Sequence, residues 1–133
     1  MINIHIGNCL EKLKELPENT VQSCITSPPY WGLRNYGHED QFGAEETPFI
    51  YVDHLVKAMR EVHRVLKEDG TLWLNLGDAY SKKSFNGEIK TKDLLGLPWM
   101  VAFALRSDGW YLRQDIIWHK PNPMPESVRD RCT

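Results

Sequence analysis

The chain has 133 residues, of which 41% are hydrophobic and 26% charged, and its formal net charge is −2. These values are typical of an ordinary globular domain with a single core. No apolar run approaches the roughly 20 residues that a membrane span needs, so we expect no membrane partner. The negative net charge argues against a chain that binds a nucleic-acid backbone strongly by itself, because phosphate contacts need clustered Lys and Arg.

The N-terminal sequence has neither a basic segment nor a long apolar segment, so we expect no signal peptide and a cytoplasmic location. Three widely spaced cysteines, Cys9, Cys24 and Cys132, predict neither a disulfide framework nor a zinc site. The five histidines show no metal-ligand spacing. We therefore predict reduced thiols and no metal.

The first 31 residues predict two strands separated by a helix. Ile2, Ile4 and Ile6 alternate with polar residues, which predicts a half-buried strand over residues 2–6. Leucines at positions 10, 13 and 16 recur at helical spacing, and Pro17-Glu18-Asn19 ends that helix. Residues 21–26 form a β-favouring run that two prolines stop. Strand, helix and strand in so few residues predict a βαβ unit with parallel strands.

The middle of the chain predicts a loop, a long helix and a strand. Residues 32–46 are rich in Gly and charge, and they predict either a lid over a pocket or a solvated loop. Thr47 and Pro48 predict the start of a helix that ends near Lys67. Its last turns carry Arg60 and Arg64, which with Lys67 predict a solvated basic face. Asp69-Gly70 breaks the chain before a strand over residues 72–76.

The last third predicts a mobile polar loop, a helix and a strand. Residues 81–93 are aperiodic, and we expect their lysines to be solvated rather than bound to phosphate. A helix is predicted from about Leu94 to Arg106 and a strand from Trp110 to Trp118. Three prolines then predict a stiff, extended segment over residues 119–127. The whole pattern predicts one α/β domain, residues 1–133, with a sheet covered by helices.

These elements are arranged around Thr26-Ser27-Pro28-Pro29-Tyr30-Trp31-Gly32. Neither proline has an N–H, so the backbone there only accepts hydrogen bonds. Ser27 supplies another oxygen, and Tyr30 and Trp31 supply flat apolar faces. Acceptors beside a stacking surface, at the end of a strand, suit a planar ring with an amino group, such as a nucleobase. The structural alternative is a rigid turn on which the aromatic rings pack.

Residues 26–37 resemble the catalytic motif (Ser/Asp/Asn)-Pro-Pro-(Tyr/Phe) of amino-methylating DNA methyltransferases. Four other stretches resemble flanking blocks of that family, namely residues 6–11, 61–67, 70–78 and 115–127. Their order resembles the β arrangement, in which the catalytic half comes first. The resemblance implies a partial Rossmann-like fold of the S-adenosylmethionine-dependent methyltransferases, with a mostly parallel sheet flanked by helices.

The resemblance also implies roles for single residues. Ser27 and the Pro28 carbonyl would accept the hydrogens of the target amine, and the Tyr30 ring would stack on a flipped base; together with Pro29 they make up the implied catalytic set. The implied cofactor contacts are Gly7, Asn8 (in place of the family's acid), Thr26 and Ser27. The implied contacts to the base or to DNA are Trp31, Arg34, Tyr36, His119, Lys120 and Asn122.

The reaction implied by the resemblance moves a methyl group from S-adenosylmethionine to an exocyclic amine of double-stranded DNA. Ser at the first motif position favours N4 of cytosine over N6 of adenine. The Pro-Cys dipeptide of C5-cytosine enzymes is absent, so neither Cys9 nor Cys24 is expected to be a nucleophile.

The family's glycine-rich cofactor motif, Phe-x-Gly-x-Gly, is also absent, since Phe42-Gly43-Ala44 lacks the second glycine. We therefore expect a truncated or split enzyme that needs a C-terminal half or a second chain. One alternative is an inactive fragment that binds only DNA or a partner. Another is an unrelated α/β domain that binds a small molecule.

Overall fold

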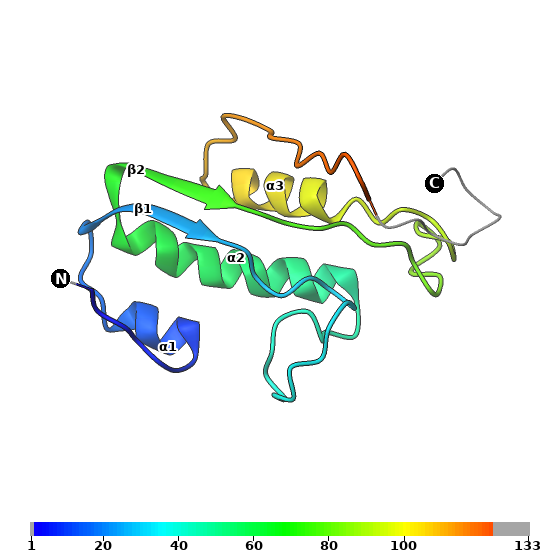
Figure 1. Cartoon of the computed structure of the whole chain (residues 1–133), viewed down its shortest axis with the longest axis horizontal. Coiled ribbons are helices and arrows are strands. Elements are labelled where there is room, and N and C mark those ends of the chain that lie inside the picture. Colours follow the sequence, from blue (N-terminus) through cyan, green and yellow to red (C-terminus); the bar gives the residue numbers. More distant parts are fainter. Residues whose placement is uncertain (1, 124–133) are drawn as a thin grey trace.

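The computed structural model describes residues 2–123 and contains three helices and two strands among them. In chain order these are α1 (Cys9–Lys14), β1 (Val21–Thr26), α2 (Pro48–Val65), β2 (Leu66–Leu74) and α3 (Leu97–Ser107) (Figure 1). The predicted α/β order of residues 9–107 is confirmed. The predicted extended segment over residues 119–127 lies partly outside the described residues.

The two strands pair in parallel, as predicted, and their arrows point the same way in Figure 1. Cys24 pairs with Leu72 and Thr26 with Leu74. Between the pairs Val21–Leu66 and Ser23–Thr71, β1 advances by two residues and β2 by five. Residues 67–70 therefore lie opposite Gln22 alone and form a bulge, and the predicted chain break at Asp69-Gly70 falls within it.

The core lies between the sheet and the pair α2 and α3. Tyr51 and Leu55 of α2 and Leu97 and Val101 of α3 are almost fully buried. Cys24, Leu72 and Leu74 pack against this core from the sheet. The helix α2 begins as predicted, because the Thr47 hydroxyl accepts from the N–H of Ile50 at 3.2 Å and Pro48 occupies the first turn.

The predicted solvated basic face at the end of α2 is wrong for Arg64, whereas the Arg60 side chain is 61% exposed, as predicted. Arg64 is partly buried and donates to the carbonyl oxygens of Leu13 (2.8 Å) and Leu16 (3.1 Å), which fixes the end of α1 on α2. The Arg60 guanidinium forms a bidentate ion pair with the Asp108 carboxylate at the end of α3, with N–O distances of 2.6–2.9 Å. Both side chains thus join helices. Lys67, on the bulge, is exposed.

The strands predicted over residues 2–6 and 110–118 are wrong, because neither segment has a strand partner among residues 2–123. Backbone in the extended conformation becomes a strand only when its N–H and C=O groups pair with a neighbour. Ile2, Ile4 and Ile6 are 82–89% exposed. Tyr111 (80%) and Trp118 (76%) are as open, and of the second segment only Trp110 packs against the core.

The loop predicted over residues 81–93 has no long helix or strand, but it is folded back and anchored. Isolated antiparallel bridges join Tyr80 to Leu94 and Phe85 to Ile89. Since Leu94 is held in a bridge, α3 begins at Leu97 rather than at Leu94 as predicted. The carboxylate of Asp78 accepts from the N–H groups of Gly96 (3.0 Å) and Leu97 (3.1 Å), which caps α3 from the end of β2. Within the described residues, none of the helices is both long and apolar enough to cross a membrane.

Candidate active site at the end of the parallel strands

The predicted catalytic residues lie where β1 ends. Ser27 to Tyr30 follow β1 directly, and residues 75–78 follow β2. The N–H of Asn75 donates to the carbonyl of Thr26 at 2.9 Å, so the two chain segments leave the sheet together. The carboxyl ends of parallel strands are the usual place for a ligand in an open α/β sheet.

Ser27 and Tyr30 are in direct contact. The Ser27 hydroxyl donates to the phenol oxygen of Tyr30 at 3.2 Å, and Ser27 itself is exposed. A serine hydroxyl has one hydrogen and two lone pairs. Because Tyr30 takes the hydrogen, the lone pairs of Ser27 stay available to accept from an external N–H.

The backbone carbonyls of the turn are not equivalent. The Tyr51 phenol donates to the carbonyl of Pro29 at 3.0 Å, and the N–H of Leu33 donates to the carbonyl of Tyr30 at 3.3 Å. Among the described residues, no donor reaches the carbonyl of Pro28. The fold therefore leaves the Pro28 oxygen as a free acceptor beside Ser27.

Burial raises the pKa of the Tyr51 phenol, and the charge of Glu45 raises it further. The phenol therefore stays protonated over the physiological pH range and acts as a donor. This keeps the Pro29 carbonyl occupied.

The Tyr30 ring rests against the backbone of Gly77, in the segment that follows β2. A Cβ added at Gly77 would lie 2.7 Å from two ring carbons of Tyr30. Only a residue without a side chain permits this contact. The ring of Tyr30 is thus a fixed, half-buried surface at the end of the sheet.

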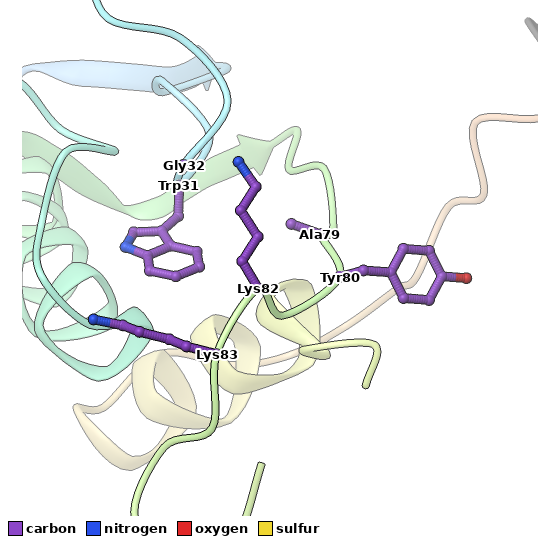
Figure 2. A pocket seen from close by; sticks show the side chains of 6 residues that line it. All are labelled: Trp31, Gly32, Ala79, Tyr80, Lys82 and Lys83. Atoms are coloured by element: carbon purple, nitrogen blue, oxygen red, sulfur yellow. The ribbon is translucent and has the colours of Figure 1, made fainter. Parts of the chain in front are cut away.

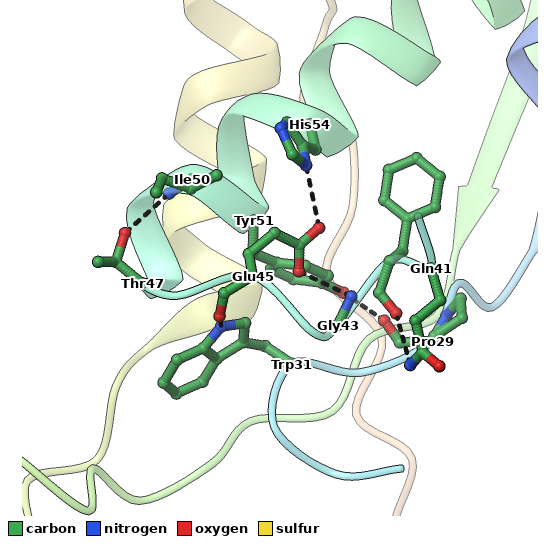
Figure 3. Close-up of polar contacts among 10 residues, drawn as sticks. Pro29, Trp31, Gln41, Gly43, Glu45, Thr47, Ile50, Tyr51 and His54 are labelled. Atoms are coloured by element: carbon green, nitrogen blue, oxygen red, sulfur yellow. Dashed lines mark hydrogen bonds and ion pairs between the residues drawn. The ribbon is translucent and has the colours of Figure 1, made fainter. Parts of the chain in front are cut away.

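Glu45 joins the loop of residues 31–46 to the turn and to α2, as Figure 3 shows. Its carbonyl accepts from the Trp31 indole N–H at 2.9 Å, and its carboxylate accepts from the N–H of Gly43 at 2.8 Å and meets His54 Nδ1 at 3.2 Å. Gly43 has φ +89, and a Cβ there would lie 2.6 Å from the Tyr30 carbonyl oxygen. The loop thus packs tightly against residues 27–30, the predicted catalytic turn.

One pocket opens beside this turn, and a second lies between the start of α1, the 39–45 loop and α2. The first, of about 370 Å³, is lined by Trp31, Gly32, Ala79, Tyr80, Lys82 and Lys83 (Figure 2). The second, of about 420 Å³, is lined by Asn8, by residues of the 39–45 loop and by Ile50, His54 and Lys57 of α2. Glu39, Asp40 and Glu45 make the second pocket acidic, whereas no carboxylate lines the first.

The predicted cofactor residues fall in two places. Thr26 and Ser27 lie at the end of β1, whereas Asn8 lines the acidic pocket and Gly7 precedes it. The side-chain oxygen of Asn8 accepts from the N–H of Leu10 at 2.9 Å and so caps α1. Its amide N–H groups and a second lone pair remain for a ligand.

The predicted DNA contacts are also dispersed. Trp31 lines the first pocket. Arg34 and Tyr36 are exposed on a loop that Gln41 closes, by accepting from the Tyr36 N–H at 2.6 Å and donating to the Arg34 carbonyl at 2.9 Å. His119, Lys120 and Asn122 are exposed on the segment after α3, which in Figure 1 runs back in the direction in which the strands point.

Three residues that hold the site were missed by the sequence analysis: Tyr51, Glu45 and Gly77. Tyr51 occupies a core position of an amphipathic helix, where an aromatic residue signals packing and not a hydrogen bond to a remote carbonyl. Glu45 lies in an aperiodic loop. Gly77 offered a signal, since a glycine directly after a strand often marks a close backbone approach.

A family model described as DNA methylase (N6_N4_Mtase) matches residues 21–133. The type II methyltransferase M.XycI of Xanthomonas campestris pv. cyanopsidis is 48% identical over 94% of this chain and 48% of its own length. M.SmaI of Serratia marcescens is 46% identical over 98% of this chain and 51% of its own length. The chain thus spans about half the length of these relatives.

Among solved structures, TTHA0409 of Thermus thermophilus, assigned as a DNA modification methylase, was crystallised with S-adenosyl-L-methionine. It matches 92% of this chain and 48% of its own chain, with a TM-score of 0.65 and 28% identity. The expected partial Rossmann-like methyltransferase fold is therefore confirmed, and an unrelated α/β domain is excluded. The chain belongs to the DNA methylase family of amino-methylating DNA methyltransferases.

Proposed function

We propose that residues 1–133 provide the catalytic half of an S-adenosylmethionine-dependent methyltransferase that modifies an exocyclic amine of double-stranded DNA, with N4 of cytosine preferred to N6 of adenine. One observation carries the proposal. Ser27 gives its hydrogen to Tyr30, and Pro29 and Tyr30 have their carbonyls occupied, so the free acceptors are the Ser27 lone pairs and the Pro28 oxygen.

Two adjacent acceptors suit an –NH₂ group, which has two hydrogens to donate. An exocyclic amine is a weak nucleophile because its lone pair is delocalised into the ring. Hydrogen bonds to Ser27 and Pro28 draw electron density toward the nitrogen as it becomes tetrahedral, and they are strongest in the transition state. The Tyr30 ring, backed by Gly77, stacks on the flipped base and fixes its plane.

Bound S-adenosylmethionine supplies the electrophilic methyl group on a sulfonium. As the new N–C bond forms, the S–C bond breaks, and the amine then loses one proton through its acceptors to solvent. For cofactor binding, the amide of Asn8 and the carboxylates of the acidic pocket offer partners for the amino and hydroxyl groups of an adenosine. Thr26 and Ser27 would border the methyl group at the strand end.

A second candidate is a module that binds DNA or a partner without catalysis. The missing Phe-x-Gly-x-Gly motif and the half-length match to the relatives favour it for residues 1–133 taken alone. On the first proposal, a C-terminal half or a second chain supplies the rest of the cofactor pocket, and the enzyme acts in the cytoplasm beside a restriction partner.

The test is nucleoside mass spectrometry of DNA from a methylation-free host that expresses the complete reading frame encoding residues 1–133. We expect N4-methylcytosine from the unaltered protein, a loss of at least about 100-fold with Ser27→Ala, and full methylation with Ser23→Ala, a matched change on the sheet. N6-methyladenine would reverse the base preference only. A soluble protein that leaves neither mark would favour the binding module.

A further inference from the structure

The first pocket joins the catalytic turn to two lysines that the proposed chemistry does not use. We propose that Lys82 and Lys83, together with Trp31, form a binding site for the phosphodiester backbone of DNA beside the base at Ser27–Tyr30. The inference rests on the proposed function, because it takes the bound ligand to be the DNA whose base is methylated.

The two lysines lie on an anchored segment. Ser81 is 3% exposed, and its hydroxyl donates to the carbonyl of Lys83. Its N–H donates to the Asp93 carbonyl at 2.8 Å, and its carbonyl accepts from the Lys92 N–H at 2.7 Å. The base of the loop is thus tied at both ends, and the positions of Lys82 and Lys83 are set by the fold.

Phe85 fastens the same segment to the catalytic turn. Its side chain is 6% exposed and meets Trp31 edge-to-face, with ring centroids 6.0 Å apart. It also meets Phe49 of α2 at 6.4 Å, and the Lys83 ammonium lies 5.2 Å from its ring centroid. In Figure 2 the Lys82 side chain runs beside the Trp31 indole and the Lys83 side chain runs below it.

The charges identify the ligand as an anion. Both lysines are exposed, and among the described residues neither forms an ion pair. No Asp or Glu lines this pocket, whereas three carboxylates line the pocket near Asn8. An anion is therefore attracted to the first pocket and repelled by the second.

Phosphodiester groups are the anions that DNA brings to this place. A nucleotide whose base lies at Ser27–Tyr30 carries a phosphate on each side of its sugar. Lysine binds phosphate as a flexible point charge, without reading the base sequence. The indole between the two lysines supplies a face for the sugar or a neighbouring base.

The test is fluorescence anisotropy with a DNA duplex over a series of salt concentrations, using the complete reading frame. The slope of log K against log salt is negative, and we expect Lys82→Gln and Lys83→Gln each to make it shallower by about 0.9. Each change should also weaken binding roughly five-fold at about 0.15 M salt. Both changes should weaken all duplex sequences equally, because phosphates carry no sequence information. Lys67→Gln, an equal charge change on the bulge at the other end of the sheet, is the control and should leave both values unchanged.

The possible outcomes separate this inference from the proposed function. Methylation by the unaltered protein, with Lys82→Gln and Lys83→Gln binding like Lys67→Gln, would overturn only the phosphate site. Weakened binding of one duplex sequence alone would also overturn it, in favour of a base contact. Binding that responds as expected without methylation would overturn the proposed function only, and a lack of any DNA binding would overturn both.

Discussion

The two sides of the sheet differ sharply, although the same two strands form both. On the covered side, Cys24, Leu72 and Leu74 pack against the core of α2 and α3. On the open side, Ile25 is 81% exposed and Trp73 is 49% exposed. Both sides carry apolar residues, but only one has an element to pack against. The sequence of a strand thus specifies an apolar face, but the helix or strand that packs against that face is specified by another part of the chain.

The candidate catalytic turn, residues 27–30, is held by contacts from the covered side. Tyr51 of α2 holds the Pro29 carbonyl, and Gly77 supports the Tyr30 ring. Residues 2–6 and 111–118 resemble the open side, because their apolar side chains are also exposed. Many exposed large apolar side chains in one small domain suggest a surface that another segment covers. This agrees with the proposal that a second half or a second chain completes the enzyme.

The largest expected loss of stability comes from a change in the core on the covered side, whereas a matching change in residues 2–6 should have little effect. Leu55→Ala removes a side chain that is 1% exposed and should lower the free energy of unfolding by about 2–5 kcal/mol, because a cavity remains. Ile4→Ala, at a residue 82% exposed, should change it by less than about 0.5 kcal/mol. Urea unfolding followed by circular dichroism measures both. Equal losses would show that residues 2–6 are packed in solution.

A smaller effect is expected where β2 meets the turn. Gly77→Ala places a Cβ 2.7 Å from the Tyr30 ring and should destabilise the protein by about 1–3 kcal/mol through overpacking. Methyl transfer should fall as well, because the ring is displaced. Gly87→Ala, whose Cβ would meet nothing, is a control for the added methyl but also carries the cost of a positive φ. Unchanged stability and activity in Gly77→Ala would contradict the ring contact.

Tyr51→Phe isolates one hydrogen bond on the covered side. It keeps the ring but leaves the Pro29 carbonyl without its donor, which should cost about 1–2 kcal/mol of stability. We also expect a lower rate at saturating DNA, because the freed carbonyl competes with that of Pro28 for the amine. Tyr111→Phe, at a tyrosine that is 80% exposed and lies outside the proposed site, is the matched control and should change neither value. A normal rate in Tyr51→Phe would remove the positioning role.

The smallest effect concerns the helix ends. Hydrogen bonds from Arg60 hold the pKa of Asp108 below its ordinary value of 3.8. The pair therefore stabilises the fold above pH 3.8, and this contribution is lost as the pH falls through the lower folded-state pKa. Thermal unfolding should show a slightly lower midpoint for Asp108→Asn at about pH 6, with the difference vanishing in strong acid. A difference that grew in acid would contradict this sign.

Local chemistry made the middle of the fold predictable. Thr47-Pro48 marked the start of α2, and two prolines marked the end of β1, because caps and missing N–H groups act within a few residues. Residues 110–118 were misjudged because a strand depends on a partner far away in sequence. Acceptor chemistry predicted the candidate catalytic residues, but Tyr51 and Glu45 were missed, since their bonds span 22 and 14 residues.

The contact between Tyr30 and Gly77 also has a consequence for how this family diverges. Positions 30 and 77 share one volume, so a side chain at 77 is tolerated only if the ring at 30 becomes smaller or turns away. Methylases that keep a full aromatic ring at the first position should keep glycine at the second, whatever DNA sequence they modify. Although they lie far apart along the chain, the two positions should therefore mutate together or not at all.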